Sequence, residues 1–261
     1  MESDVLSVDL SEERRRTVGF VKKIIKGARA KGVAVGLSGG VDSAVTGAVC
    51  VEALGKKKVL CLLMPSEHTP QADLEDARAL AKAWEVEVIE VPIDGIAKAF
   101  GVAVGKEGTR IAKANVLARV RMTIIYYFAN SRGLLVAGTG DRSELELGFY
   151  TKWGDGGADF LPLAHLYKTQ VRALGKELGL PRRVVYKPAS PQLWKGHRAE
   201  DELPAGYGKL DLVLHYLLEE GYGPAKAAAR ASVPVEVAEK ALKMHEASEH
   251  KRRLPPSLYG K

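Results

Sequence analysis

Cysteine is scarce in this sequence of 261 residues, which contains only Cys50 and Cys61. Both lie in apolar runs, and neither belongs to a CxxC pattern or has a histidine close to it in the sequence. This placement favours two inert core thiols over a disulfide or a redox pair. Because reduced thiols are typical of a reducing compartment, we expect a cytoplasmic protein.

Long apolar runs are absent too, and no segment approaches the ~18 residues that a membrane span requires. Residues 1–16 are charged and lack the apolar stretch of a signal peptide, so we expect no membrane partner. Amide side chains are equally rare, and they are Asn115, Asn130, Gln71, Gln170 and Gln192. Few amides beside many Lys, Arg and Glu are typical of heat-adapted proteins. We therefore expect unfolding above the roughly 45–65 °C of mesophilic domains, and a melt inside that band would contradict this.

What the chain does contain is the composition of a globular protein, with 46% hydrophobic and 27% charged residues. Its length suits one α/β domain spanning 1–261. The net charge of +7 indicates anionic partners. Charge alone leaves open whether these are nucleic acids or phosphorylated small molecules.

Apolar runs alternate with amphipathic stretches along the first two thirds of the chain. The pattern predicts strands at 33–37, 59–64, 86–91 and 134–137, and helices at 11–30, 41–54, 70–84, 111–130 and 168–178. Such alternation predicts an α/β fold, a doubly wound and mostly parallel sheet with helices on both faces. Thr69 and Pro70 read as the N-cap and first residue of their helix. Two or three polar helices follow up to about Arg253, so the C-terminal part is predicted to be helical.

Two segments carry further hints. Residues 188–208 are rich in proline and glycine with little periodicity, which predicts a mobile lid. Residues 122–129 are apolar at nearly every position of a long predicted helix. That helix is either buried on all sides in the core or shared between the sheet and a homodimer interface.

The segment from Gly36 to Ser43, with the sequence GLSGGVDS, joins a predicted strand to a predicted helix. Glycines let backbone N–H groups approach an anion, and the start of the helix adds partial positive charge. The hydroxyls of Ser38 and Ser43 can donate as well. The segment matches neither G-x-x-x-x-G-K-[ST] nor G-x-G-x-x-G. It therefore predicts a phosphate site of another kind.

The SGGVDS run resembles the pyrophosphate loop of the N-type ATP pyrophosphatases, which cleave ATP between the α and β phosphates. Further segments resemble motifs of the ammonia-dependent NAD synthetases within that superfamily. They are NVLARVRM at 115–122, GTGDRSE at 138–144, FYTKWGDGGAD at 149–159 and LYKTQV at 166–171. The resemblance implies an adenine nucleotide alpha-hydrolase-like fold. Because the motifs fill nearly the whole chain, it also implies no glutaminase domain and free ammonia as nitrogen donor.

The activity implied by the resemblance is that of an amide-forming ligase. The carboxylate of deamido-NAD would attack ATP to form an acyl-adenylate, and ammonia would convert it to NAD, releasing AMP and pyrophosphate. Mg²⁺ is the implied cofactor and ATP a co-substrate, with a homodimer expected and no nucleic-acid partner. Two other classes stay open: another adenylating enzyme, such as one that thiolates tRNA, and a nucleotide-binding module without catalysis. The two cysteines look unsuited to thiolation.

The resemblance also implies site residues. ATP would contact Gly36, Leu37, Ser38, Gly39, Gly40, Val41, Asp42, Ser43, Thr139, Lys168 and Ser190. Deamido-NAD would contact Asn115, Arg119, Lys152, Asp159, His250 and Lys251. Asp42 and Glu144 both follow predicted strand ends and would hold the metal, since hard cations prefer oxygen ligands.

Several of these positions have an alternative reading. Asp42 could be a helix cap and Glu144 a solvated side chain. Asp155, in Gly-Asp-Gly-Gly, is the implied residue that binds or deprotonates ammonium together with Thr139, but it also suits an Asx turn. Arg121 lies about 200° around the helix from Arg119, so it addresses a different environment, and a structural ion-pair role is its alternative.

The match is weakest at two places, the C-terminal His250-Lys251 pair and the lid. His250 and Lys251 reach the site only if the tail folds back or crosses a dimer. In the lid, the family commonly has Gln-Thr-Asp where this chain has His197-Arg198-Ala199. A role that depends on the missing Thr or Asp does not carry over.

Overall fold

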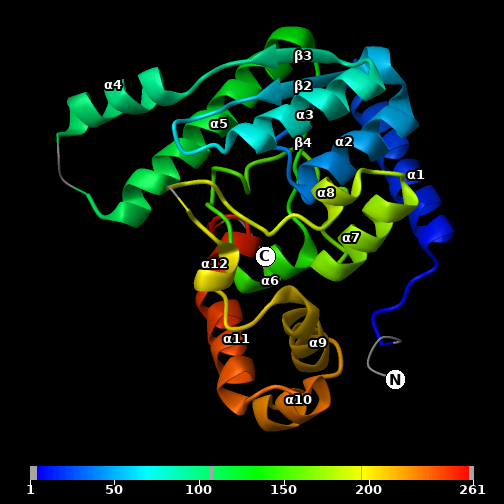
Figure 1. Cartoon of the computed structure of the whole chain (residues 1–261), viewed down its shortest axis with the longest axis vertical. Helices are drawn as coiled ribbons and strands as arrows, with labels where there is room; N and C mark the ends of the chain where they lie inside the picture. The colour runs from blue at the N-terminus through cyan, green and yellow to red at the C-terminus, as the bar shows by residue number, and fades with distance from the viewer. Residues whose placement is uncertain (1–4, 106–107, 195, 259–261) are drawn as a thin grey trace.

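The computed structural model describes residues 5–105, 108–194 and 196–258. Within them, four strands form one parallel sheet in the order β3-β2-β1-β4. The strands are β1 (Val33–Gly36), β2 (Val59–Leu63), β3 (Glu87–Glu90) and β4 (Leu135–Ala137). Helices lie on both faces of this sheet (Figure 1), which confirms the predicted α/β class.

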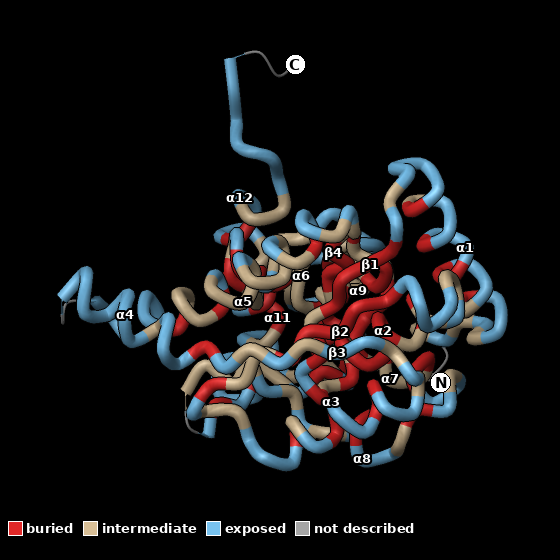
Figure 2. The backbone as a smooth tube through the Cα atoms, turned by 90° about the horizontal axis from the view of Figure 1, so that it is seen from above, coloured by how far each residue is buried: buried red, intermediate tan, exposed pale blue. Residues whose placement is uncertain are grey.

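The two faces follow from alternation along the strands. Val33 and Val35 join the core beneath α1 and α2, whereas Ala34, between them, packs in a second cluster with Ala129 of α5. Figure 2 shows the central strands β1 and β2 in the buried interior, whereas β3, at one edge of the sheet, is largely exposed. The helices around the sheet are α1 (Leu10–Ala28), α2 (Val41–Leu54), α3 (Gln71–Trp84), α5 (Arg110–Arg132) and α7 (Lys168–Glu177).

Three details differ from the sequence-based expectations. Pro70, not Thr69, is the N-cap of α3, and the Thr69 hydroxyl accepts a hydrogen bond from Ser66 N instead. The prediction missed α4 (Asp94–Val104) and the short α8 (Arg182–Val185). Helix α5 is not buried on all sides in this chain, since Tyr127 is 67% exposed. Helix α4, next to the start of α5, projects away from the rest of the molecule (Figure 1).

The last third of the chain forms a helical layer with its own apolar core. It comprises α9 (Tyr207–Leu218), α10 (Pro224–Ala231), α11 (Val235–Ala247) and α12 (Glu249–Arg252), preceded by the 3₁₀ turn η2 (Ala199–Asp201). A second 3₁₀ turn, η1 (Lys56–Lys58), leads into β2. The predicted helical C-terminal part is thus confirmed. In the described part of the chain, no helix combines the length and apolarity that a bilayer crossing needs.

The strand order creates a switch point between β1 and β4. The chain proceeds outward from β1 to β2 and β3, and then returns to place β4 on the other side of β1. The segments leaving β1 and β4 therefore diverge, and ligands of open parallel sheets bind in the crevice formed there. The loop after β1 leads into α2, and the loop after β4 leads into α6 (Arg142–Leu147).

Candidate active site

The loop from Gly36 to Ser43 has a compact, internally bonded backbone. Gly39 has φ +81°, and a Cβ there would lie 2.1 Å from the Asp73 carbonyl oxygen, so only glycine fits. The Ser43 hydroxyl donates to Gly40 O at 3.0 Å, and the Ser38 and Ser43 hydroxyls lie 3.1 Å apart. The loop thus opens onto the first turn of α2, as a phosphate site requires.

Lys187, which sequence reasoning missed, anchors this loop from outside. Its Nζ donates to Gly39 O at 3.0 Å and contacts the carboxylates of Asp73 and Asp76 at 2.7 and 2.8 Å. In a trans peptide the carbonyl and the following amide point in opposite directions. Holding the Gly39 carbonyl outward therefore turns the Gly40 N–H toward the loop interior, where Ser38 Oγ accepts from it at 3.3 Å.

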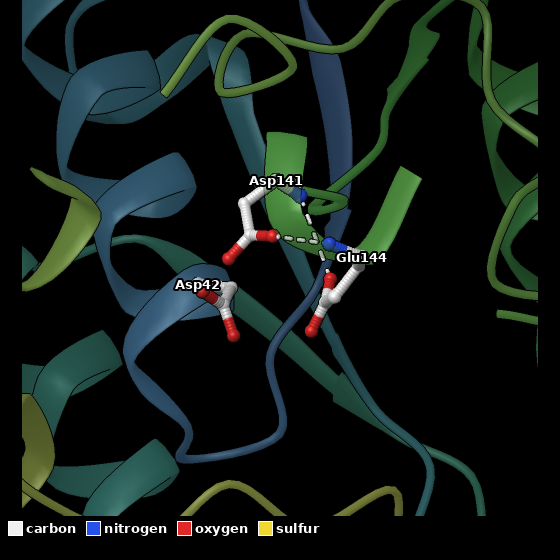
Figure 3. Close-up of side chains that lie close together, drawn as sticks. All are labelled: Asp42, Asp141 and Glu144. Atoms are coloured by element: carbon white, nitrogen blue, oxygen red, sulfur yellow. Dashed lines mark hydrogen bonds between the residues drawn. The ribbon is translucent and has the colours of Figure 1, made fainter. Parts of the chain in front are cut away.

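Three carboxylates meet at the switch point, as Figure 3 shows. Asp42 comes from α2, while Asp141 and Glu144 come from the start of α6, and their nearest ligand atoms all lie within 4.8 Å of one another. Asp141 is the N-cap of α6 and forms a capping box with Glu144. The two predicted metal ligands are thus brought together, and Asp141 is a third one that was not predicted.

Lys168 lies behind these carboxylates with 0% of its side chain exposed. Its Nζ contacts Asp42 Oδ2 at 2.7 Å, and Asp141 Oδ2 and Glu144 Oε1 at 2.8 Å each. The sequence interpretation placed Lys168 against ATP phosphates. The structure instead uses it to hold the carboxylates, and among the described residues it does not line the cavity.

The charges of this cluster suit a divalent cation. Three ionised carboxylates against one ammonium leave two excess negative charges. Burial raises the pKa of Asp141 to about 7 and that of Glu144 well above its usual range, so negative charge here is costly without a further cation. Asp42 Oδ1 is buried and makes no hydrogen bond within the described chain. An all-oxygen set with an unused carboxylate oxygen fits Mg²⁺.

A cavity of about 430 Å³ lies in front of the cluster. Of the predicted residues it is lined by Gly36, Leu37, Ser38, Asp42, Ser43, Asn115, Thr139, Glu144, Asp155, Ser190 and Lys251. A smaller cavity of about 130 Å³ shares several of these walls and adds Gly40 and Val41. Most of the predicted ATP site is therefore assembled around one space.

Asp155 faces this cavity from the Gly-Asp-Gly-Gly turn. Its Oδ1 accepts a hydrogen bond from Thr151 N at 2.9 Å, four residues earlier in the chain, whereas an Asx turn would bond the backbone two residues further on. The surrounding protein raises the pKa of Asp155 above the usual aspartate value despite this hydrogen bond. The Thr151 hydroxyl in turn donates to Asn115 Oδ1 at 2.7 Å, which joins this turn to α5.

Four predicted substrate residues lie outside the cavity lining. Arg119 donates to Lys152 O at 3.3 Å, and the Lys152 ammonium donates to the His250 carbonyl. Asp159 accepts from Tyr126 OH at 3.1 Å and from Val136 N at 2.7 Å. Arg119, Lys152 and His250 thus form a continuous surface chain of contacts, while Asp159 secures β4.

The C-terminal segment does fold back onto this surface. Lys251 Nζ donates to Gly148 O at 2.6 Å and to Tyr150 O at 2.7 Å. It therefore reaches the cavity within one chain, which was one of the two routes considered from the sequence.

The predicted lid, 188–208, supplies one wall of the cavity, although residue 195 lies outside the described residues. Trp194 stacks on His197 and is covered by the Arg110 guanidinium, 3.9 Å from the ring centroid. His197 also pairs with Glu202, so it takes a structural place in the lid where the family motif differs. In the sequence, the proline- and glycine-rich composition and the family motif that contains Ser190 both pointed to this wall.

The two cysteines are buried and unpaired. Burial raises the pKa of Cys61 to about 12, and that of Cys50 further. Neither lines the cavity, so thiol chemistry has no group to use there.

Known proteins resemble this chain over nearly its whole length. Residues 13–255 match the family model described as NAD synthase. An NH3-dependent NAD(+) synthetase of Hyperthermus butylicus is 47% identical over 256 residues, covering 98% of this chain and 93% of that protein.

Solved structures show the same relationship. An NMN synthetase of Francisella tularensis has a TM-score of 0.86 at 30% identity, covering 97% of this chain and 100% of the other. An NH3-dependent NAD synthetase of Campylobacter jejuni has a TM-score of 0.81 at 28% identity over the same shares. The chain therefore belongs to the NAD synthase family.

Proposed function

We propose that this chain amidates deamido-NAD with ammonia at the expense of ATP, giving NAD, AMP and pyrophosphate. The observation that carries the proposal is the meeting of the Gly36–Ser43 loop and the three-carboxylate cluster in one cavity. A phosphate loop beside an acidic cluster suits transfer of a nucleotidyl group. The substrates are those used by the similar synthetases.

In the first step, the nicotinate carboxylate attacks the α-phosphorus of ATP and pyrophosphate leaves. The loop amides, the first turn of α2 and the Ser38 and Ser43 hydroxyls bind the departing phosphates. Thr139 and Ser190 line the same cavity and contact ATP. A free carboxylate is a poor acyl donor, and adenylation turns its oxygen into a good leaving group.

Asp42, Glu144 and Asp141 would hold Mg²⁺, which supplies charge neutralisation at the phosphates when bound. Lys168 keeps these three side chains in place before any ligand arrives, and its charge favours their ionised forms against the effect of burial. Its role in ATP binding is therefore exerted through the carboxylates rather than by direct contact.

In the second step, ammonia attacks the acyl carbonyl and AMP leaves. Asp155, which lines the same cavity as Thr139, binds ammonium and takes one of its protons. Its raised pKa makes it a better base than a solvated aspartate.

Deamido-NAD is long enough to extend from the cavity onto the adjoining surface. Asn115 and Lys251 contact it inside, and the chain of contacts through Arg119, Lys152 and His250 continues outward. Asp159 acts by fixing the neighbouring backbone of β4. Arg119, Lys152 and His250 thus contact the half of the dinucleotide that extends beyond the cavity.

Residues 1–261 would work as one domain, in the cytoplasm, as a homodimer. Helices α4 and α5 expose apolar side chains that a second copy would cover, among them Phe100 at 46%, Val102 at 77% and Ile111 at 64% exposure. Light scattering on the purified chain would show twice the monomer mass, and a monomer at micromolar concentration would contradict this assembly.

The test of the function is an assay of deamido-NAD and ATP with ammonium or glutamine, following AMP and NAD. Ammonium should support turnover and glutamine should not. Because a structural neighbour is an NMN synthetase, nicotinate mononucleotide belongs in the assay as an alternative acceptor. Formation of ADP, or no nucleotide product at all, would contradict the proposal.

A further inference from the structure

Arg121 points toward the cavity from the middle of α5. Ile125, one turn further along the same face, packs within 3.1 Å of the position that a Cβ on Gly36 would occupy. Arg121 itself lines the cavity beside Met64, at the carboxyl end of β2. The guanidinium therefore lies near the beginning of the phosphate loop.

The hydrogen bonds of Arg121 use only neutral acceptors. Its Nε donates to Met64 O at 3.1 Å and its Nη2 to Ser66 Oγ at 3.4 Å. Within the described residues, no carboxylate lies within ion-pair distance and Nη1 makes no hydrogen bond. The ion-pair role considered from the sequence is thus not what the structure shows.

Two other cations near the loop are arranged differently. Lys168 contacts three carboxylates and Lys187 contacts two, all at 2.7–2.8 Å. Burial lowers the pKa of Arg121, while the more distant Asp155 and Asp94 act against this shift. A partly buried cation without a direct counter-ion is unfavourable unless an anion joins it.

We infer that Arg121 binds an oxyanion of the reacting groups, and this inference rests on the proposed function. The oxyanion is either the α-phosphate of ATP or the nicotinate carboxylate that attacks it. Two anions must approach each other in that step, and a guanidinium between them offsets their repulsion. Its planar set of donors also fits phosphate and carboxylate oxygens better than an ammonium does. Met64 O and Ser66 Oγ hold one edge of the guanidinium and leave the other to the ligand.

The experiment compares Arg121→Met with Arg132→Met in the full chain. Arg132 lies at the far end of the same helix and pairs with Glu87, so it controls for loss of an arginine from α5. Steady-state kinetics would give KM and kcat for ATP and deamido-NAD separately. Calorimetry with each nucleotide alone would give affinities without turnover, and thermal melts would report folding.

Arg121→Met should lower kcat/KM between about tenfold and about a hundredfold, the usual range for a hydrogen bond to a charged group. Weaker affinity for ATP would identify the α-phosphate as the ligand, and weaker affinity for deamido-NAD would identify the carboxylate. Arg121→Lys should recover only part of the loss. The melting temperature should not fall, because a cation without a direct counter-ion has been removed.

Wild-type kinetics and affinities in Arg121→Met would overturn the inference. So would a loss that accompanies a lower melting temperature and disappears in a cooler assay, since that describes a structural arginine. If the wild-type chain formed no AMP, the proposed function would fail. The two nucleotide affinities would still decide whether Arg121 binds an anion.

Discussion

The floor of the cavity and its lid are built in different ways. The floor is formed by Asp42 and Glu144 and is backed by Asp141 and Lys168, with the carboxylates 2.7–2.8 Å from a fully buried ammonium. The lid, 188–208, is mostly loop, and its residue Trp194 is held by stacking. The floor is therefore held by buried charges, whereas the lid is held by individual hydrogen bonds, such as that from Gln192 Nε2 to Asp73 Oδ2 at 2.6 Å, and by ring contacts.

This comparison predicts that substitutions in the floor change stability and chemistry, while substitutions in the lid change ligand binding alone. The largest expected effect is that of Lys168→Met. Removing the ammonium leaves the buried Asp141 and the partly buried Asp42 and Glu144 unpaired, so the free energy of unfolding should fall by about 3–5 kcal/mol. Urea denaturation measures this, and added Mg²⁺ should restore part of the loss. A change below about 1 kcal/mol would mean that the cluster is not held by this lysine.

The next largest effect is expected for Asp42→Asn. Loss of this carboxylate should lower kcat by about a hundredfold or more, because charge on the departing phosphates is then less well neutralised. The fold should stay intact in circular dichroism melts. Glu52→Gln, at the exposed end of the same helix, serves as the control. Equal rates in the two variants would remove Asp42 from the site.

In the lid, Trp194→Ala should raise KM by about tenfold and leave the melting temperature unchanged. The indole lines the cavity and joins the lid to Arg110 at the start of α5. Loss of the single cation–π contact in Arg110→Ala should have a smaller effect in the same kinetic assay. A large drop in stability for either variant would contradict the contrast between lid and floor.

The smallest effect concerns pH and Asp155. Because burial raises its pKa, the folded chain holds this proton more tightly than the unfolded chain does. The wild type should therefore lose stability relative to Asp155→Asn as pH rises through the raised pKa. The difference should vanish below the ordinary aspartate pKa. Urea denaturation of both proteins across pH would measure this, and parallel curves would contradict it.

Activity should depend on the same carboxylate, but it should rise with pH over the range in which stability falls. If Asp155 must be ionised to accept a proton from ammonium, kcat falls as pH falls through its raised pKa. The acid limb should then lie above the pH expected for a solvated aspartate. A rate that is flat down to that ordinary range would separate Asp155 from the proton transfer.

The sequence was most informative where local pattern and topology act together. Strands ending in Gly36 and Ala137 placed the loop and Glu144 at one sheet edge, because parallel strands share that edge. The long helix 111–130 and the α/β class followed from periodicity and alternation.

Other features depend on contacts between distant segments and left no local signal. Asp141 reads as an ordinary helix cap, and Lys168 reveals its three partners only once α2 and α6 are packed against α7. Arg121 and Lys187 look like ordinary basic residues in the sequence, and only the folded chain shows which groups surround their side chains. Helix α4 was missed although Ile96, Phe100 and Val104 recur at helical spacing, and none of its residues is buried in the folded chain.

The central claim is that the cavity joins a carboxylate to AMP before ammonia arrives. Deamido-NAD labelled with ¹⁸O in its nicotinate carboxylate, incubated with ATP, Mg²⁺, ammonium and the full chain, tests this directly. The carboxylate oxygen that attacks the α-phosphorus leaves with AMP when ammonia attacks the carbonyl. Mass spectrometry should therefore find one ¹⁸O atom in AMP, whereas unlabelled AMP, or label in phosphate beside ADP, would contradict the account.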